Sequence, residues 1–211
     1  MNVQRTLIII AASLLVVACG GDDDVPSTSD PAATPGSKSL GGQGAAGTTV
    51  PSFTAPGTKL AFNENAIVPF ASEDQAGALG VAVTRVDVGT AAELASFELG
   101  DKVAGMTPYY VHVQVTNETG ANFAYTSLGL TNATLADGEY AQDVTMISDF
   151  APCDNASAPK EFTTKGAVYE TCIVGLAGAG TSVTGMAYTG GTYDKVPSAP
   201  NYSAANITWT Q

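Results

Sequence analysis

The chain has 211 residues, of which 20 are acidic and 8 are basic, and its formal net charge at pH 7 is -12. Because the basic residues are few and dispersed, they cannot form a basic patch that binds the phosphate backbone of a nucleic acid. Nucleic acid is therefore not expected as a partner. Charged residues make up 13% of the chain, against roughly 25% in an average soluble protein, which favours a secreted β-protein. Beyond a leader and a linker, the length suits one domain.

The first residues have the pattern of a bacterial lipoprotein signal. Arg5 gives a basic start, an apolar run extends from Leu7 to Val17, and Ala18 and Cys19 follow. The run is too short to span a bilayer but suits the centre of a secretory signal peptide. Its end resembles a lipobox, in which the cysteine receives diacylglycerol before cleavage on its amino side.

By that resemblance, residues 1–18 are a signal peptide that is removed, and Cys19 is the lipidated first residue of the mature protein. The membrane is then a partner through the lipid anchor, and the protein lies on the extracytoplasmic face of the cell membrane. Stable anchoring needs more than one acyl chain, which lipoprotein processing supplies. An ordinary signal peptide with an incidental cysteine, or an uncleaved anchor, is the alternative.

Residues 19–56 are expected to form a disordered linker behind the lipidated cysteine. After three aspartates at 22–24, the segment consists mostly of Ser, Thr, Pro, Ala and Gly, so it cannot bury enough apolar surface to order itself. As a flexible coil it reaches on the order of 35 Å, which holds a domain clear of the lipid. The aspartates are better interpreted as solvated charge than as a cation site.

The folded part opens with strand patterns. In Lys59–Phe70 apolar residues flank a polar interruption at 63–65, which predicts a strand, a turn or bulge, and a second short strand ending at Pro69. Leu79–Val88 is rich in β-branched residues and predicts a longer strand. Thr90–Leu99 is compatible with one or two helical turns, because Thr90 can cap and Glu93 stands three positions on, although a loop is the alternative.

The segment Pro108–Gly120 is the one around which the other strands are expected to pack. Val111, Val113 and Val115 alternate with Tyr110, His112 and Gln114, so the pattern predicts a half-buried strand with the valines on its core face. Asn117 and Gly120 are expected to end it.

Several shorter strands are predicted beyond this point. Val168–Ala177 has a core-like centre and a Gly-rich turn after it, and Ile207 and Trp209 share one face of the closing strand. Between 149 and 165 no regular pattern is found. The remaining predicted strands are Phe123–Tyr125, Leu128–Leu135, Ala141–Ser148 and Val183–Tyr188.

Eight or nine short strands with at most a short helical turn predict an all-β fold, an antiparallel β-sandwich. Several segments together carry a resemblance to a known family: 57–60, 66–70, 81–86, 109–117, the pair Cys153 and Cys172, and 183–188. Their pattern of strands and turns is similar to the immunoglobulin-like domain of actinobacterial lipoproteins, a group related in fold to the telokin-like secreted antigens of mycobacteria. The resemblance covers residues 57–211 and implies two antiparallel sheets, but it supplies no catalytic residue.

The chain has three cysteines. If Cys19 is lipidated, Cys153 and Cys172 are left as a possible pair. Outside the reducing cytosol they are expected to form a disulfide, which would stabilise the fold by roughly 3 kcal/mol in the chain-entropy model. A free reactive thiol or a metal site is the alternative.

The chain has one histidine, His112, so a Ser-His-Asp site would have to use it as its histidine. No Gly-x-Ser-x-Gly motif accompanies it, and no further His or unassigned Cys is left to complete a zinc site. His112 is therefore expected to be a cross-strand surface residue. The acidic residues contain no Asp-x-Asp-x-Asp-Gly loop, so they are interpreted as solvated.

Tyrosine is frequent, and tyrosines on a sandwich face or its loops would suit a recognition patch. The sequence thus predicts a lipid-anchored, extracytoplasmic and non-enzymatic binding or interaction module at the cell envelope, with an extracellular protein or glycan as the possible partner and no cofactor. A small-ligand or cation carrier that uses a pocket between the sheets or the acidic loops is the first alternative. A hydrolase of unrecognised type is the second.

Overall fold

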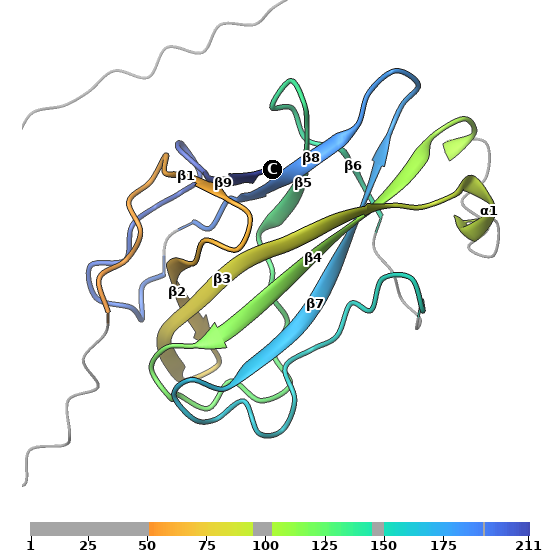
Figure 1. Cartoon of the computed structure of the whole chain (residues 1–211). Coiled ribbons are helices and arrows are strands. Elements are labelled where there is room, and N and C mark those ends of the chain that lie inside the picture. The colour runs from red at the N-terminus through yellow and green to blue at the C-terminus, as the bar shows by residue number, and fades with distance from the viewer. Residues whose placement is uncertain (1–50, 95–102, 145–149, 192) are drawn as a thin grey trace, which may run out of the picture. The chain divides into compact units, whose positions relative to one another are not determined.

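A computed structural model of the chain describes residues 51–94, 103–144, 150–191 and 193–211. Within this part, nine strands form two sheets that pack face to face as a β-sandwich (Figure 1). The predicted all-β sandwich is confirmed. The expected signal peptide, Cys19 and most of the expected linker lie outside the described residues.

The two sheets contain four and five strands, and every named strand pair is antiparallel except β1 and β9, which are parallel. The four-stranded sheet has the order β1 (Lys59–Ala61), β9 (Ile207–Thr210), β8 (Val183–Tyr188) and β5 (Thr131–Leu135). The five-stranded sheet has the order β2 (Ala66–Ser72), β3 (Gln75–Val88), β4 (Thr107–Asn117), β7 (Val168–Ala177) and β6 (Gln142–Asp143).

The central strand of the five-stranded sheet is β4, the strand expected to organise the fold. Val111, Val113 and Val115 are fully buried between the sheets, as their alternation predicts. On the other face Gln114 is exposed, but Tyr110 is only 3% exposed. Tyr110 is buried because a second apolar cluster, which includes Phe150 and the two cysteines, covers this end of the outer face.

The main core lies between the sheets. Ile207 and Trp209 both face it from β9 and are fully buried, as predicted. The polar edge of the Trp209 ring is satisfied, because Nε1 donates a hydrogen bond of 2.9 Å to the carbonyl of Glu64. A buried indole with its donor satisfied contributes its full apolar area to packing.

The short helix α1 (Ala91–Leu94) is the predicted helical turn. A carboxylate oxygen of Glu93 accepts hydrogen bonds from the backbone N–H of Thr90 at 2.5 Å and from its hydroxyl at 3.1 Å. In these contacts the carboxylate of Glu93 reaches back to the capping residue, which is the reason that a threonine followed three positions later by a glutamate marks a helix start. No helix in the described part has the length and apolar character needed to cross a bilayer.

Several sequence predictions differ from the structure. The strand expected to end at Pro69 continues to Ser72, because it pairs with β3 as far as the turn that joins them. Phe123–Tyr125 is not a strand, because this segment crosses from the end of β4 in one sheet toward β5 in the other, with Phe123 buried in the core. The strand predicted from Leu128 begins at Thr131, since Leu130 has a φ of 61° and cannot be extended. Of Ala141–Ser148, only Gln142–Asp143 is a strand, and residues 145–149 lie outside the described part.

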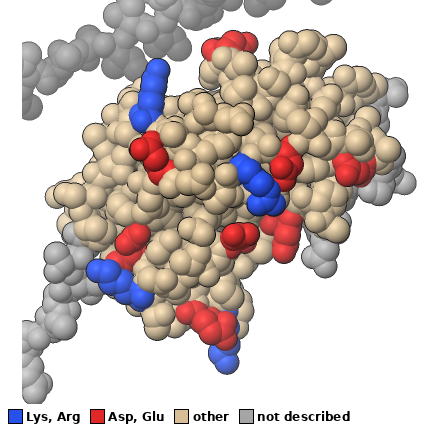
Figure 2. All heavy atoms as spheres, in the orientation of Figure 1, with Lys and Arg blue, Asp and Glu red and all other residues tan. Residues whose placement is uncertain are grey.

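On the face drawn in Figure 2, Lys and Arg side chains are separated from one another and interspersed with Asp and Glu.

Candidate functional site

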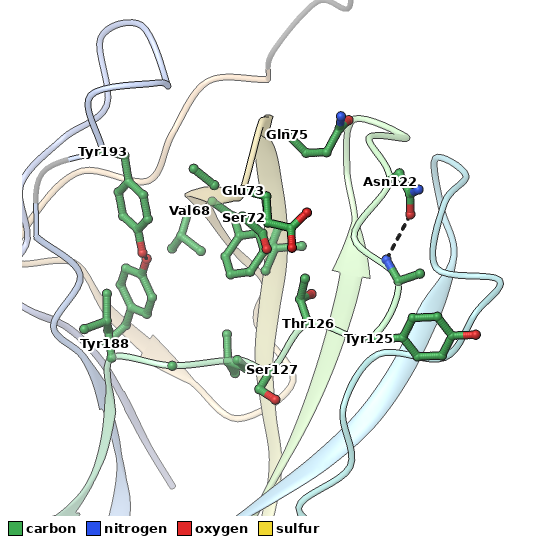
Figure 3. A pocket seen from close by; sticks show the side chains of 17 residues that line it. Val68, Ser72, Glu73, Gln75, Asn122, Tyr125, Thr126, Ser127, Tyr188 and Tyr193 are labelled. Carbon is green, nitrogen blue, oxygen red and sulfur yellow. Dashed lines mark hydrogen bonds between the residues drawn. The ribbon is translucent and has the colours of Figure 1, made fainter.

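A pocket of about 760 Å³ opens between the two sheets at one end of the sandwich (Figure 3). We call it the mouth pocket; it is lined by residues of 68–75, Leu79, residues 122–130, Tyr188 and Tyr193. At this end β2 and β8 finish and β3 and β5 begin. Its volume lies within the range of roughly 300–1,000 Å³ that is typical of small-molecule sites.

The floor of the mouth pocket is apolar and rigidly packed. Val68, Leu79 and Tyr188 line it, and each of these side chains is at most 1% exposed. Phe70 also lines it and makes an edge-to-face contact with the buried Phe123, with ring centroids 4.9 Å apart. The pocket is therefore an opening in the main core, lined by side chains that the fold itself fixes.

The rim is polar and is supplied by two segments that lie far apart in the sequence. The turn between β2 and β3 contributes Ser72, Glu73 and Gln75. Their side chains make no hydrogen bond with another residue of the described ranges, so their donors and acceptors are available to a ligand. The segment 122–130 contributes Asn122, whose side-chain oxygen accepts from the N–H of Ala124 at 3.2 Å while its NH₂ group stays available.

Left-handed backbone is concentrated at this rim. Five non-glycine residues of the described part have positive φ, and three of them line the mouth pocket: Glu73 at 49°, Tyr125 at 62° and Leu130 at 61°. This conformation is unfavourable for residues other than Gly, Asn and Asp, and strained residues of this kind cluster at ligand sites.

Hydrogen bonds from distant segments hold the three strained residues in place. The N–H of Tyr125 donates to the carbonyl of Ala158 at 2.8 Å, and the carbonyl of Leu130 accepts from the N–H of Thr189 at 2.8 Å. The carbonyl of Glu73 accepts from the ammonium group of Lys195. With the backbone fixed in this way, the side chains of Tyr125 and Leu130 remain 70% and 51% exposed.

The inner wall of the mouth pocket is uncharged. The hydroxyls of Tyr188 and Tyr193 lie 2.9 Å apart (Figure 3), and the Tyr188 hydroxyl donates to the carbonyl of Pro69 at 3.3 Å. Burial raises the pKa of both phenols, so both are neutral at physiological pH. Among the residues that line the pocket, Glu73 carries the one carboxylate, and no Lys, Arg or His is present.

His112 lies on the outer face of the five-stranded sheet and does not line the mouth pocket. Its Nδ1 is 3.2 Å from the guanidinium of Arg85, and its Nε2 is 3.0 Å from a carboxylate oxygen of Asp87 without the alignment of a good hydrogen bond. Burial, and secondarily the charge of Arg85, lowers the His112 pKa, while Asp87 opposes the shift. Both ring nitrogens therefore face charged side chains in a cross-strand cluster.

Cys153 and Cys172, the pair expected to form a disulfide, are bonded in the structure, with their Cα atoms 5.2 Å apart. Both are buried in the outer-face cluster together with Phe150 and Tyr110. The bond joins the irregular segment after Phe150 to β7. Among the described residues, no group of three or more His, Cys, Asp or Glu is placed to hold a metal ion.

Comparisons with known proteins give one structural likeness. No family model matches the chain, and no curated protein matches it. The crystal structure of MPT63, a secreted protein from Mycobacterium tuberculosis, is similar over 75% of this chain and 100% of that chain, at 18% sequence identity and a TM-score of 0.46. The neighbour is thus a secreted mycobacterial protein, but at a TM-score below 0.5 nothing about this chain's function is inferred from it.

The sequence does not predict the mouth pocket. The pattern of Phe123–Tyr125 predicts a strand, and nothing in the sequence marks Glu73, Gln75 or Asn122 as ligand-binding residues. The rim joins a turn near residue 73 to a loop near 125, and no local pattern in either segment indicates that they meet. The carrier alternative predicts a pocket between the sheets, but the sequence does not indicate which residues would line it.

Proposed function

We propose that the protein is a lipid-anchored, extracytoplasmic and non-enzymatic binding module of the cell envelope, and that its ligand binds in the mouth pocket. The observation that carries this proposal is the placement of three strained, non-glycine residues on the rim, each held by a contact from a distant part of the chain. Strain persists where the surrounding structure enforces it, and it is typical of preorganised binding sites.

The proposed location rests on the signal pattern that ends at Cys19 and on the linker pattern of residues 19–56. The bond between Cys153 and Cys172 supports an oxidising compartment, because disulfides are rare in the reducing cytosol. Anchoring through a linker would present the sandwich to ligands outside the membrane.

A non-enzymatic role is favoured over a hydrolase by the surroundings of His112. A general base needs a ring nitrogen within reach of the group it deprotonates, but both nitrogens of His112 lie against Arg85 and Asp87. The mouth pocket is lined by no histidine.

The pocket between the sheets also bears on the carrier alternative. Its volume and apolar floor suit a small ligand, or one end of a longer one, as well as they suit contact with a large partner. We therefore propose that a small molecule, or one end of a longer ligand, binds in the pocket. The proposal includes no bound cation.

Hydrogen exchange followed by mass spectrometry tests this proposal. The full chain, purified in detergent, is compared with and without an extract of the cell envelope. Slower exchange confined to residues 72–75 and 122–130 is the expected result. Protection on the His112 face instead, or no protection at all, would contradict binding in the mouth pocket. The variant Glu73→Gln should reduce the protection, whereas Glu139→Gln, at another exposed glutamate that does not line the pocket, should keep it.

A further inference from the structure

We infer that the ligand of the mouth pocket is a neutral carbohydrate; this rests on the proposed function and specifies its ligand class. The inference follows from three properties of the lining residues: their charge, their hydrogen-bonding groups and the position of their aromatic and apolar side chains.

The charge of the site disfavours anions. No Lys, Arg or His is among the lining residues, and the carboxylate of Glu73 lies at the rim. Tyr188 and Tyr193 are neutral phenols whose pKa is raised by burial. An anionic ligand would enter without a counter-charge and would meet Glu73, and a buried unpaired charge is costly.

A cationic ligand would also gain little binding free energy from the charges at this site. Lys195 already places its ammonium group on the turn that carries Glu73, where it contacts the carbonyl of Glu73 and lies 3.3 Å from a carboxylate oxygen of Asp74. This cation compensates negative charge next to Glu73. A second cation would meet one exposed carboxylate, and an exposed ion pair contributes only about 0–1 kcal/mol.

The rim supplies hydrogen-bonding groups suited to hydroxyls. A carboxylate accepts through two oxygens, so Glu73 can bind two adjacent hydroxyl groups of a sugar. The amides of Gln75 and Asn122 each offer donors, and Ser72 adds a hydroxyl that both donates and accepts. Sugar hydroxyls are likewise both donors and acceptors, so a sugar ring can satisfy these groups without bringing a charge.

The apolar parts of the site match the C–H faces of sugar rings. Inside the pocket the floor of Val68 and Leu79 is apolar. At the rim the Tyr125 ring is 70% exposed and projects away from the Tyr188 and Tyr193 pair (Figure 3). A saccharide longer than the pocket would extend over this ring and stack on it, as aromatic rings pack on apolar faces.

The experiment measures binding of the full chain in a detergent that has no sugar headgroup. The probes are neutral oligosaccharides of increasing length, the same series containing carboxylated sugars, and lysine-rich peptides, compared by isothermal titration calorimetry. We expect neutral saccharides to bind and their affinity to rise with length. Carboxylated sugars should bind at least about tenfold more weakly.

Two variants assign the contacts. Glu73→Gln should weaken the binding of short and long saccharides by a similar factor of about ten or more, because it removes a carboxylate acceptor from the pocket lining. Tyr125→Asn should leave short saccharides almost unchanged and abolish the gain from length. The control variants are Glu139→Gln and Tyr140→Asn, which replace exposed residues that do not line the pocket, and both should bind as the wild type does.

Failure of this inference can be distinguished from failure of the proposed function. Tighter binding of peptides or carboxylated sugars than of neutral ones would overturn the carbohydrate assignment, and so would binding of no probe when extract still protects residues 72–75 and 122–130. If neither the probes nor the extract protects the rim, both proposals are wrong. Saccharide binding that is insensitive to Glu73→Gln and to Tyr125→Asn would place the sugar elsewhere and overturn the inference.

Discussion

The backbone N–H of Tyr125 donates a 2.8 Å hydrogen bond to the carbonyl of Ala158, and the N–H of Ala158 donates one of 2.7 Å to the carbonyl of Thr126. This two-way contact joins the loop after β4 to the segment that follows the disulfide. It holds Tyr125 at a φ of 62° with its ring exposed. The rim of the pocket therefore depends on a contact between two segments without regular secondary structure.

Replacing Tyr125 by Asn is expected to raise the free energy of unfolding by up to about 1 kcal/mol, because Asn tolerates left-handed backbone that costs other residues roughly 1–2 kcal/mol. The exposed ring contributes little burial that could be lost. Urea unfolding of the full chain measures the change. The control is Tyr140→Asn, which is expected to be neutral or destabilising, because the Tyr140 hydroxyl accepts a hydrogen bond from Asn206. A clear loss of stability in Tyr125→Asn would show that its backbone is not strained.

Gly185 allows β8 and β9 to approach closely, and Gly185→Ala is expected to lower the free energy of unfolding by about 3 kcal/mol or more. A Cβ atom at this position would lie 1.8 Å from the backbone carbonyl oxygen of Trp209. Backbone cannot move aside as the end of a side chain can, so the pairing of Met186 with Trp209 would be disturbed. Thermal and urea unfolding measure the loss.

The matched control for that substitution is Gly178→Ala. No atom lies within 4 Å of a Cβ built at Gly178, so the change should be neutral or slightly stabilising. Equal stability of the two variants would contradict the close approach of β8 and β9.

Features that depend on neighbouring residues could be predicted from the sequence. Asn117 and Gly120 were expected to end the central strand, and the structure gives the reason: the side-chain oxygen of Asn117 accepts from the N–H of Gly120 at 2.7 Å, and Gly120 has a φ of 76°. An Asx turn followed by a left-handed glycine is a local device. The same holds for the Thr90 and Glu93 contact at α1.

Features that depend on distant segments could not be predicted. Phe123 and Tyr125 alternate around a small residue as in a strand, yet one is buried in the core and the other is exposed at the rim. Their roles are decided by where the chain crosses between the sheets, which a period of two does not encode. The mouth pocket was missed for the same reason, since Glu73 and Tyr125 come together only through the packing of the sandwich.

The disulfide is expected to contribute about 3 kcal/mol to the stability of the fold, since it closes a loop with a sequence separation of 19. Replacing both Cys153 and Cys172 by Ser should lower the free energy of unfolding by that amount. It should also increase hydrogen exchange at Phe150 and Tyr110, which pack in the same outer-face cluster. Unchanged exchange in the double variant would show that this cluster holds together without the bond.

His112 is the one histidine of the chain, so the one pair of imidazole C–H signals in a proton NMR titration reports its pKa. Burial holds that pKa below its ordinary value of 6.5, and the charge of Arg85 lowers it further, while Asp87 and Glu170 act in the opposite direction. Arg85→Gln should therefore raise the His112 pKa and Asp87→Asn should lower it. A fall in Arg85→Gln would contradict the geometry of this cluster.

The same shift predicts how His112 affects stability as the pH changes. The His112 pKa is lower in the folded chain than in the unfolded chain, so the unfolded chain binds more protons between the two values. The contribution of His112 to stability is therefore fully present above the ordinary pKa of about 6.5 and is lost as the pH falls through the interval below it. Relative to His112→Gln, which does not titrate, the wild type should lose stability on acidification across this interval. A wild type that gains stability relative to His112→Gln there would show that Asp87, and not burial, determines the protonation of the ring.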